Sequence, residues 1–94
     1  MRTIERATAF RRDYKRESKG RQRGTLETEL AAVLVALATD AVLPARLRDH
    51  ALSGNWSGYR ECHVRPGLLM IYRKTDNDLL RLARLGSHSE LFKK

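Results

Sequence analysis

Hydrophobic residues in the first half of the chain recur at helical spacing. Ala7, Phe10 and Tyr14 are separated mostly by charged residues, a pattern that predicts an amphipathic helix over about residues 7–18. A second apolar stripe at spacings of three and four predicts another helix, with Thr25 as its N-cap. This stripe consists of Leu26, Leu30, Val33, Leu34 and Leu37. A short loop joins the two helices, so we expect an α-hairpin.

The second half of the chain changes to a period of two, which indicates β-strands over residues 59–64, 68–74 and 79–85. Pro66 and Gly67 are typical of a type II turn between the first two strands. In the third strand, Leu80, Leu82 and Arg84 are expected to share one face.

Three weaker segments complete the fold prediction. Residues 2–6 are a candidate first strand, residues 47–58 a loop, and the C-terminal tail a short helical turn. The order β-α-α-β-β-β predicts an α+β fold, with helices packed on one face of a small antiparallel sheet.

Length and cysteine content limit the class of protein. With 94 residues, the chain is expected to form a single domain, residues 1–94. Its longest apolar run, residues 30–38, is shorter than the about 20 residues of a transmembrane helix, and its start lacks the apolar stretch of a secretory signal. Cys62 is the single cysteine and cannot form an internal disulfide. We therefore expect a cytoplasmic protein without membrane contact.

Charge narrows the class of partner. The formal net charge is +8 and the pI is about 10.4. A small protein this basic usually binds a polyanion, most often nucleic acid and sometimes an acidic protein. The simpler alternative is a well-solvated basic surface.

The candidate chemistry rests on three histidines, His50, His63 and His88. No Cys or His spacing typical of a metal site and no phosphate-binding glycine loop is present, so we expect no metal and no cofactor. Two histidines and an arginine can cleave RNA without a metal, by moving two protons and stabilising the charged phosphate. Each histidine taken alone is as well explained by simple solvation. The residues alone therefore favour a nucleic-acid-binding domain, with nuclease activity as the sharper hypothesis.

Two segments, "DHALSGNWSGYRECHVRPGLLMIYR" (49–73) and "LLRLARLGSHSELF" (79–92), resemble the YafQ-like branch of the RelE superfamily. These proteins are the toxins of bacterial toxin–antitoxin pairs. The helical half of the chain resembles the family only in its layout, which is also β-α-α-β-β-β. The matching positions include Asp49, His50, Gly54, Trp56, Gly58, Tyr59, Arg60, His63, Pro66, Tyr72, Arg84, Gly86, Ser87, His88 and Phe92.

The resemblance implies an mRNA interferase, an endoribonuclease that cuts mRNA in the ribosomal A site. It implies His50, His63, His88 and Arg84 as catalytic residues. Its partners would be mRNA, the ribosome and an acidic antitoxin, and DNA would be contacted only through that antitoxin. The residues assigned to substrate binding are Arg60, Glu61, Arg65 and Phe92.

One departure from the family pattern concerns the proposed site. The family has an acidic residue after the proline, where this chain has Gly67. Glu61 shares a strand face with His63 but lies away from the turn, so it is not an obvious replacement. Two alternatives remain, an inhibitor of a protein target such as DNA gyrase and a degenerate toxin that only binds its antitoxin. The three retained histidines argue against both.

Overall fold

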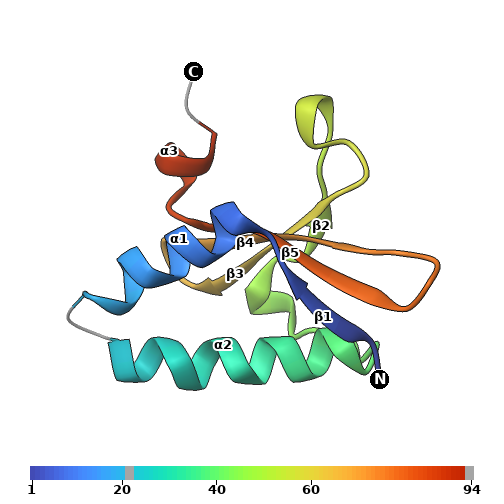
Figure 1. The fold of residues 1–94 in the computed structure, drawn as a ribbon, viewed down its shortest axis with the longest axis horizontal. Coiled ribbons are helices and arrows are strands. Elements are labelled where there is room, and N and C mark those ends of the chain that lie inside the picture. Colours follow the sequence, from blue (N-terminus) through green and yellow to red (C-terminus); the bar gives the residue numbers. More distant parts are fainter. Residues whose placement is uncertain (21–22, 93–94) are drawn as a thin grey trace.

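The structure is a computed structural model that describes residues 1–20 and 23–92 (Figure 1). A first strand is followed by two long helices, several short elements, a three-strand meander and a C-terminal helical turn. The order is β1 (Thr3–Arg6), α1 (Thr8–Ser18), α2 (Arg23–Ala38), η1 (Ala45–Leu47), β2 (His50–Ala51), η2 (Gly54–Trp56), β3 (Arg60–Arg65), β4 (Leu68–Lys74), β5 (Leu79–Gly86) and α3 (His88–Leu91). The predicted α+β class, the α-hairpin and the C-terminal turn are confirmed.

Five strands form one sheet in the order β1-β5-β4-β3-β2. Strands β2 to β5 pair antiparallel with their neighbours, but β1 runs parallel to β5. The sheet is therefore mixed, and the prediction of an antiparallel sheet was wrong in this strand. The prediction of a loop over residues 47–58 was also wrong in part, because His50 and Ala51 pair with β3 as a fifth strand.

The main core lies between the helices and one face of the sheet. Phe10 of α1 and Leu26 and Leu37 of α2 are almost completely buried against Met70 and Tyr72. Cys62 belongs to this core, as a small apolar side chain would, and burial raises the pKa of its thiol to about 12. Helix α2 begins at Arg23, so Thr25 lies inside its first turn, and the prediction of Thr25 as N-cap was wrong.

A smaller apolar cluster covers part of the opposite face. Leu69 and Ile71 of β4 and Ala83 of β5 are buried there beneath Leu91 of α3. Trp56 packs at the edge of this cluster, with its ring 5.2 Å from that of Tyr59, and so holds the loop between β2 and β3 against the sheet. The helical turn α3 is thereby fixed over the face that the long helices leave uncovered (Figure 1).

A bulge in β5 changes which side chains face this uncovered side. Tyr72 pairs with Leu82, whereas Ile71 pairs with Arg84, so Ala83 is an extra residue. Paired residues of neighbouring strands share a face, so Arg84 lies on the face of Ile71, while Leu82 lies on the face of Tyr72. The prediction that Leu80, Leu82 and Arg84 share a face was wrong, because a bulge interrupts the period of two. Among the described residues, no helix is long and apolar enough to cross a membrane.

Candidate active site

One row of residues crosses four strands on the face away from the long helices. His50 of β2 pairs with Glu61 of β3, Glu61 with Ile71 of β4, and Ile71 with Arg84 of β5. Neighbouring strands lie about 4.8 Å apart, so this row places His50 and Arg84 roughly 14 Å from each other along the sheet. A bound nucleotide can span part of the distance between His50 and Arg84. Ile71, which lies between these two residues in the row, is fully buried.

His50 is held through both ring nitrogens. Its Nδ1 atom lies 2.6 Å from the carbonyl oxygen of Arg48, which can only accept, so Nδ1 carries a proton. Its Nε2 atom lies 3.0 Å from Oε2 of Glu61. The Glu61 side chain is 6% exposed, and its Oε1 atom accepts no hydrogen bond from the described residues. A buried carboxylate that orients a histidine is a common arrangement in catalytic sites.

His63 lies two positions beyond Glu61 on β3 and therefore on the same face. It borders a pocket of about 390 Å³ next to the turn after β3. Three arginines also line this pocket, namely Arg46, Arg48 and Arg65. Arg65 forms an ion pair of 3.3 Å with Glu29 of α2. The pocket combines a histidine with positive charge, which suits a phosphate group.

His88 and Phe92 come from the C-terminal turn. Ser87 and Glu90 form a capping box that starts α3 directly after β5, and this fixes where His88 leaves the sheet. The rings of His88 and Phe92 lie 4.9 Å apart, and Phe92 packs beside the apolar cluster under α3. His88 itself is exposed. An exposed histidine beside an aromatic ring can meet a nucleotide base and its phosphate together.

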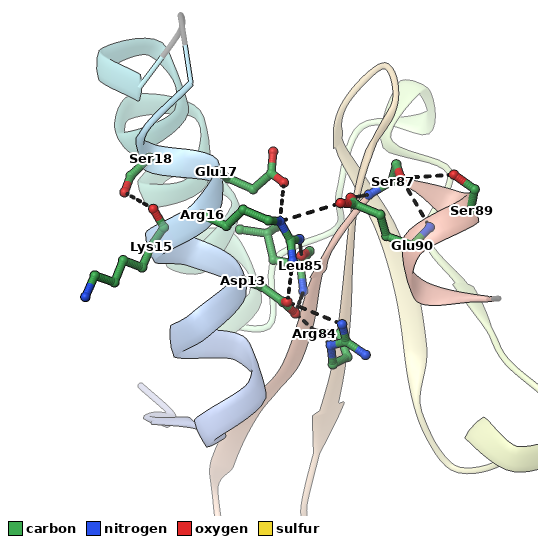
Figure 2. Close-up of polar contacts among 10 residues, drawn as sticks. All are labelled: Asp13, Lys15, Arg16, Glu17, Ser18, Arg84, Leu85, Ser87, Ser89 and Glu90. Carbon is green, nitrogen blue, oxygen red and sulfur yellow. Dashed lines mark hydrogen bonds and ion pairs between the residues drawn. The ribbon is translucent and has the colours of Figure 1, made fainter.

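Arg84 is tied to helix α1 by a buried carboxylate (Figure 2). Its Nε atom donates to Oδ2 of Asp13 at 2.7 Å, and its Nη2 atom to Oδ1 at 3.3 Å. Burial by itself raises the pKa of Asp13, but hydrogen bonds from Arg84 and from the backbone of Leu85, with the charges of Arg84 and Arg16, outweigh it. The net effect lowers the pKa of Asp13, so Asp13 is a carboxylate at neutral pH.

Arg60 is a predicted site residue that the strand places on the opposite face, and Arg65, which pairs with Leu68 of the main core and contacts Glu29 of α2, is another. Arg60 pairs with Tyr72, whose ring lies in the main core. Its Nη2 atom contacts Asp49 at 3.0 Å, and the hydroxyl of Tyr72 also donates to Asp49. The assignment of Arg60 to substrate binding stays a prediction that this placement does not support. Its observed contacts brace the segment that leads into His50.

Comparison with known proteins identifies the family. The model of the YafQ family, described as the bacterial toxin of a type II toxin–antitoxin system, matches residues 2–93. The chain belongs to the YafQ family. This confirms the resemblance seen in the sequence and extends it to the helical half.

Three similar proteins support this assignment. The mRNA interferase toxin YafQ of Escherichia coli K12 is 52% identical over 50 residues, and the alignment spans about half the length of each protein, 53% of both. The YafQ chain in the crystal structure of the E. coli DinJ–YafQ complex is 36% identical, covers 98% of this chain and 99% of that one, and superposes with a TM-score of 0.84. A metal-bound toxin from Helicobacter pylori is 39% identical, with coverages of 98% and 100% and a TM-score of 0.85.

This YafQ-type fold also has pockets outside the histidine row, but its described residues offer no group of side chains for binding a metal. A pocket of about 550 Å³ lies between α1 and α2 and is lined by Phe10, Tyr14 and Leu30 among others, and none of the residues that line it belongs to the histidine row. Among residues 1–20 and 23–92, no group of three or more His, Cys, Asp or Glu side chains could hold a metal ion.

Sequence reasoning missed Asp13 and Asp49, two acids that hold predicted site elements. Asp13 follows Phe10 by three positions and so falls on the buried stripe of α1. A charged residue on an apolar stripe is a signal that could have found it, since such a charge needs a partner. Asp49 matched the family pattern, but it was given no role because the short strand that begins at His50 was not expected.

Proposed function

We propose that this chain is the toxin of a type II toxin–antitoxin pair and acts as an endoribonuclease that cleaves mRNA in the ribosomal A site. The observation that supports this best is the row of His50, Glu61 and Arg84, with His63 on the same sheet face. Its site of action would be the cytoplasm, where mRNA is translated. The E. coli relative carries the name mRNA interferase, which favours RNA cleavage over inhibition of a protein target such as DNA gyrase.

The proposed reaction transfers two protons around one phosphate. A neutral histidine takes the proton of the ribose 2′-OH, and the 2′-oxygen then attacks the adjacent phosphorus. The bond from phosphorus to the 5′-oxygen breaks, and a protonated histidine gives its proton to that oxygen. The products are a 2′,3′-cyclic phosphate, or its opened 3′-phosphate, and a 5′-OH end.

The contacts of each side chain suggest its role. His63 makes no hydrogen bond within the described part of the chain, whereas both ring nitrogens of His50 are engaged, so we assign proton abstraction to His63. His88 would be the general acid, because it projects from α3 as an exposed side chain. Arg84 would stabilise the negative charge of the crowded phosphate. Glu61 and Arg65 would line the substrate path, and Phe92 would stack on a base.

The partner that this proposal requires is an acidic antitoxin. With a net charge of +8, the toxin attracts acidic peptide segments as well as RNA. An antitoxin segment that lies over the histidine row would inhibit by covering it, and contact with DNA would come only through the antitoxin. The solved DinJ–YafQ complex is a precedent for such a pair in this family.

The test is primer extension on a defined mRNA in a translating extract, with and without the protein. New stops within codons, and fragments whose 5′ ends accept phosphate directly from a kinase, are expected. Intact mRNA at high protein concentration, or fragments that already carry a 5′-phosphate, would contradict the proposal. His63→Ala serves as the control, because it removes the proposed base.

A further inference from the structure

Helix α1 supplies hydrogen-bond partners to the backbone at the end of β5, where a neighbouring strand would otherwise supply them. Strand β1 pairs with β5 only from Leu79 to Leu82. Beyond that point, the backbone N–H of Leu85 donates to Oδ2 of Asp13 at 2.9 Å, and its carbonyl accepts from Nη2 of Arg16 at 3.1 Å. Two side chains of α1 therefore satisfy the edge of β5 where it carries Arg84 (Figure 2).

The Asp13 carboxylate accepts hydrogen bonds from two nitrogens of the Arg84 guanidinium, in addition to the one from the backbone of Leu85. Such a two-pronged contact fixes both the position and the plane of the guanidinium. Asp13 is only 3% exposed, so water and salt weaken this pair little, whereas the Arg84 side chain remains 27% exposed. The third guanidinium nitrogen, Nη1, takes no part in the contact with Asp13 and can meet a phosphate.

An open pocket of about 510 Å³ adjoins this pair between α1 and α3. Arg16, Arg84, Ser89 and Glu90 line it, so Arg84 reaches solvent beside the helical turn that carries His88. Arg16 also approaches Glu90 at 3.5 Å, but both side chains are more than 40% exposed, so this link holds α3 only weakly. Asp13 is the contact that dominates the placement of Arg84.

We propose that Asp13 is a positioning residue, which holds the Arg84 guanidinium in place for the phosphate before RNA binds. This inference rests on the proposed ribonuclease function and deepens it. A long arginine side chain otherwise samples many rotamers, and an arginine fixed in advance does not have to be ordered during the reaction. Asp13 engages Nε and Nη2 of Arg84, so Nη1 remains as the donor for the phosphate.

The first experiment compares Asp13→Asn with Glu17→Gln in steady-state cleavage of an RNA substrate by the whole toxin. Asparagine has the shape of aspartate, and its amide oxygen can still accept a hydrogen bond from the Leu85 amide. Its NH₂ group cannot accept from Arg84 and it carries no negative charge, so the contact that holds the Arg84 guanidinium is lost. We expect kcat to fall about tenfold to hundredfold, the usual cost of a misplaced group, with little change in KM. Glu17 contacts Arg16 and not Arg84, so Glu17→Gln should cleave at the parent rate.

A double-mutant cycle with Arg84→Ala separates positioning from a general loss of structure. If Asp13 acts through Arg84, Asp13→Asn should cause no further loss in the Arg84→Ala background. The same fractional loss in both backgrounds would overturn the inference, as would an unchanged kcat in Asp13→Asn. If Arg84→Ala itself cleaves at the parent rate, Arg84 does not serve the reaction and the inference is overturned, whereas a parent protein that does not cleave RNA would put the proposed function at fault.

A measurement on the unaltered protein decides the matter even if Asp13→Asn does not fold. The ¹⁵N relaxation of the Arg84 Nε–H group reports how rigidly the guanidinium is held. We expect an order parameter near 0.85, like that of rigid backbone, and a much lower value for Arg12, which is exposed on α1. An Arg84 value below about 0.6 in the folded protein would show a mobile side chain and refute the proposal.

Discussion

The Nε2 atom of His50 lies 3.0 Å from the Oε2 atom of Glu61, on the neighbouring strand of the sheet. Through this contact Glu61 occupies a different position in the site from the acidic residue that the family has where this chain has Gly67. The missing acid would sit at the turn beside His63, whereas Glu61 lies two positions before His63 on β3 and contacts His50. The two carboxylates would therefore serve different histidines.

Replacement of Glu61 should impair cleavage through His50. In Glu61→Gln the side chain keeps its size but loses the charge that orients the imidazole, so we expect kcat to fall about tenfold to hundredfold. The thermal midpoint should stay the same or rise, because a buried carboxylate with one unpaired oxygen is removed. Initial cleavage rates and thermal melts check both expectations. Glu5→Gln, an exposed change on β1, is the control.

An unchanged cleavage rate in Glu61→Gln would show that His50 does not depend on this carboxylate. If both variants instead melt at much lower temperature than the parent, the loss of rate would reflect the fold and not the orientation of His50.

Asp40 should make the stability of the protein depend on pH in the acid range. Hydrogen bonds from Lys74 and Arg2 lower the pKa of this carboxyl from 3.8 to about 2. A lowered pKa means that the contribution of Asp40 to stability is present above pH 3.8 and is lost as pH falls through about 2. Asp40→Asn should therefore melt at lower temperature than the parent at pH 7, and the difference should shrink toward pH 2. Asparagine tolerates the positive φ of 58° at this position.

Thermal melts at several pH values test this prediction, with Asp76→Asn as the matched control in the exposed turn after β4. A difference between Asp40→Asn and the parent that is constant from pH 7 to pH 2 would contradict it, because the charge of Asp40 would then not be the cause.

The fold could be predicted from sequence where one periodicity ran without interruption. The apolar stripe from Leu26 to Leu37 indicated α2, and the alternation from Tyr59 to Val64 indicated β3. The pairing partners could not be predicted in the same way. That β1 runs parallel to β5 depends on where the α-hairpin returns the chain, and a strand of four exposed residues carries no pattern that specifies a neighbour.

The candidate site was predictable as a set of residue types and not as an arrangement. The family motif supplied His50, His63 and His88, but only the two-residue strand β2 brings His50 next to Glu61. The bulge at Ala83 likewise moves Arg84 onto the histidine face, against the period of two. Asp13 is 71 residues from Arg84 in the chain, so no local pattern could join them.

His88 should be required for cleavage but not for stability. Loss of a proton-transfer group typically lowers the rate about 10²–10⁴-fold, so His88→Ala should lose that much cleavage. Because the side chain is exposed, the thermal midpoint and ribosome binding should stay nearly unchanged. The pH–rate profile should also lose its alkaline limb, which reports the proton of the general acid. Ser89→Ala, on the same turn, is the control.

Near-parent cleavage by His88→Ala would move the acid role to another histidine. A rate that falls while the alkaline limb persists would instead indicate that His88 binds the substrate together with Phe92.

Restoring an acid at position 67 should increase activity. Gly67 has a φ of +82°, and a Cβ there meets no atom within 4 Å, so a side chain has room but a residue other than glycine would be strained in this conformation. For that reason Gly67→Asp and Gly67→Asn should each lose about 1–2 kcal/mol of stability. Both variants should still fold, because Asp and Asn tolerate positive φ better than most residues. Only the aspartate adds a carboxylate to the pocket of His63 and its arginines. Gly67→Asp should therefore cleave several-fold faster than Gly67→Asn, measured as initial rates on the same mRNA. Equal rates for two folded variants would mean that this site works without an acid at the turn, and that Glu61 acts on His50 without a second carboxylate beside His63.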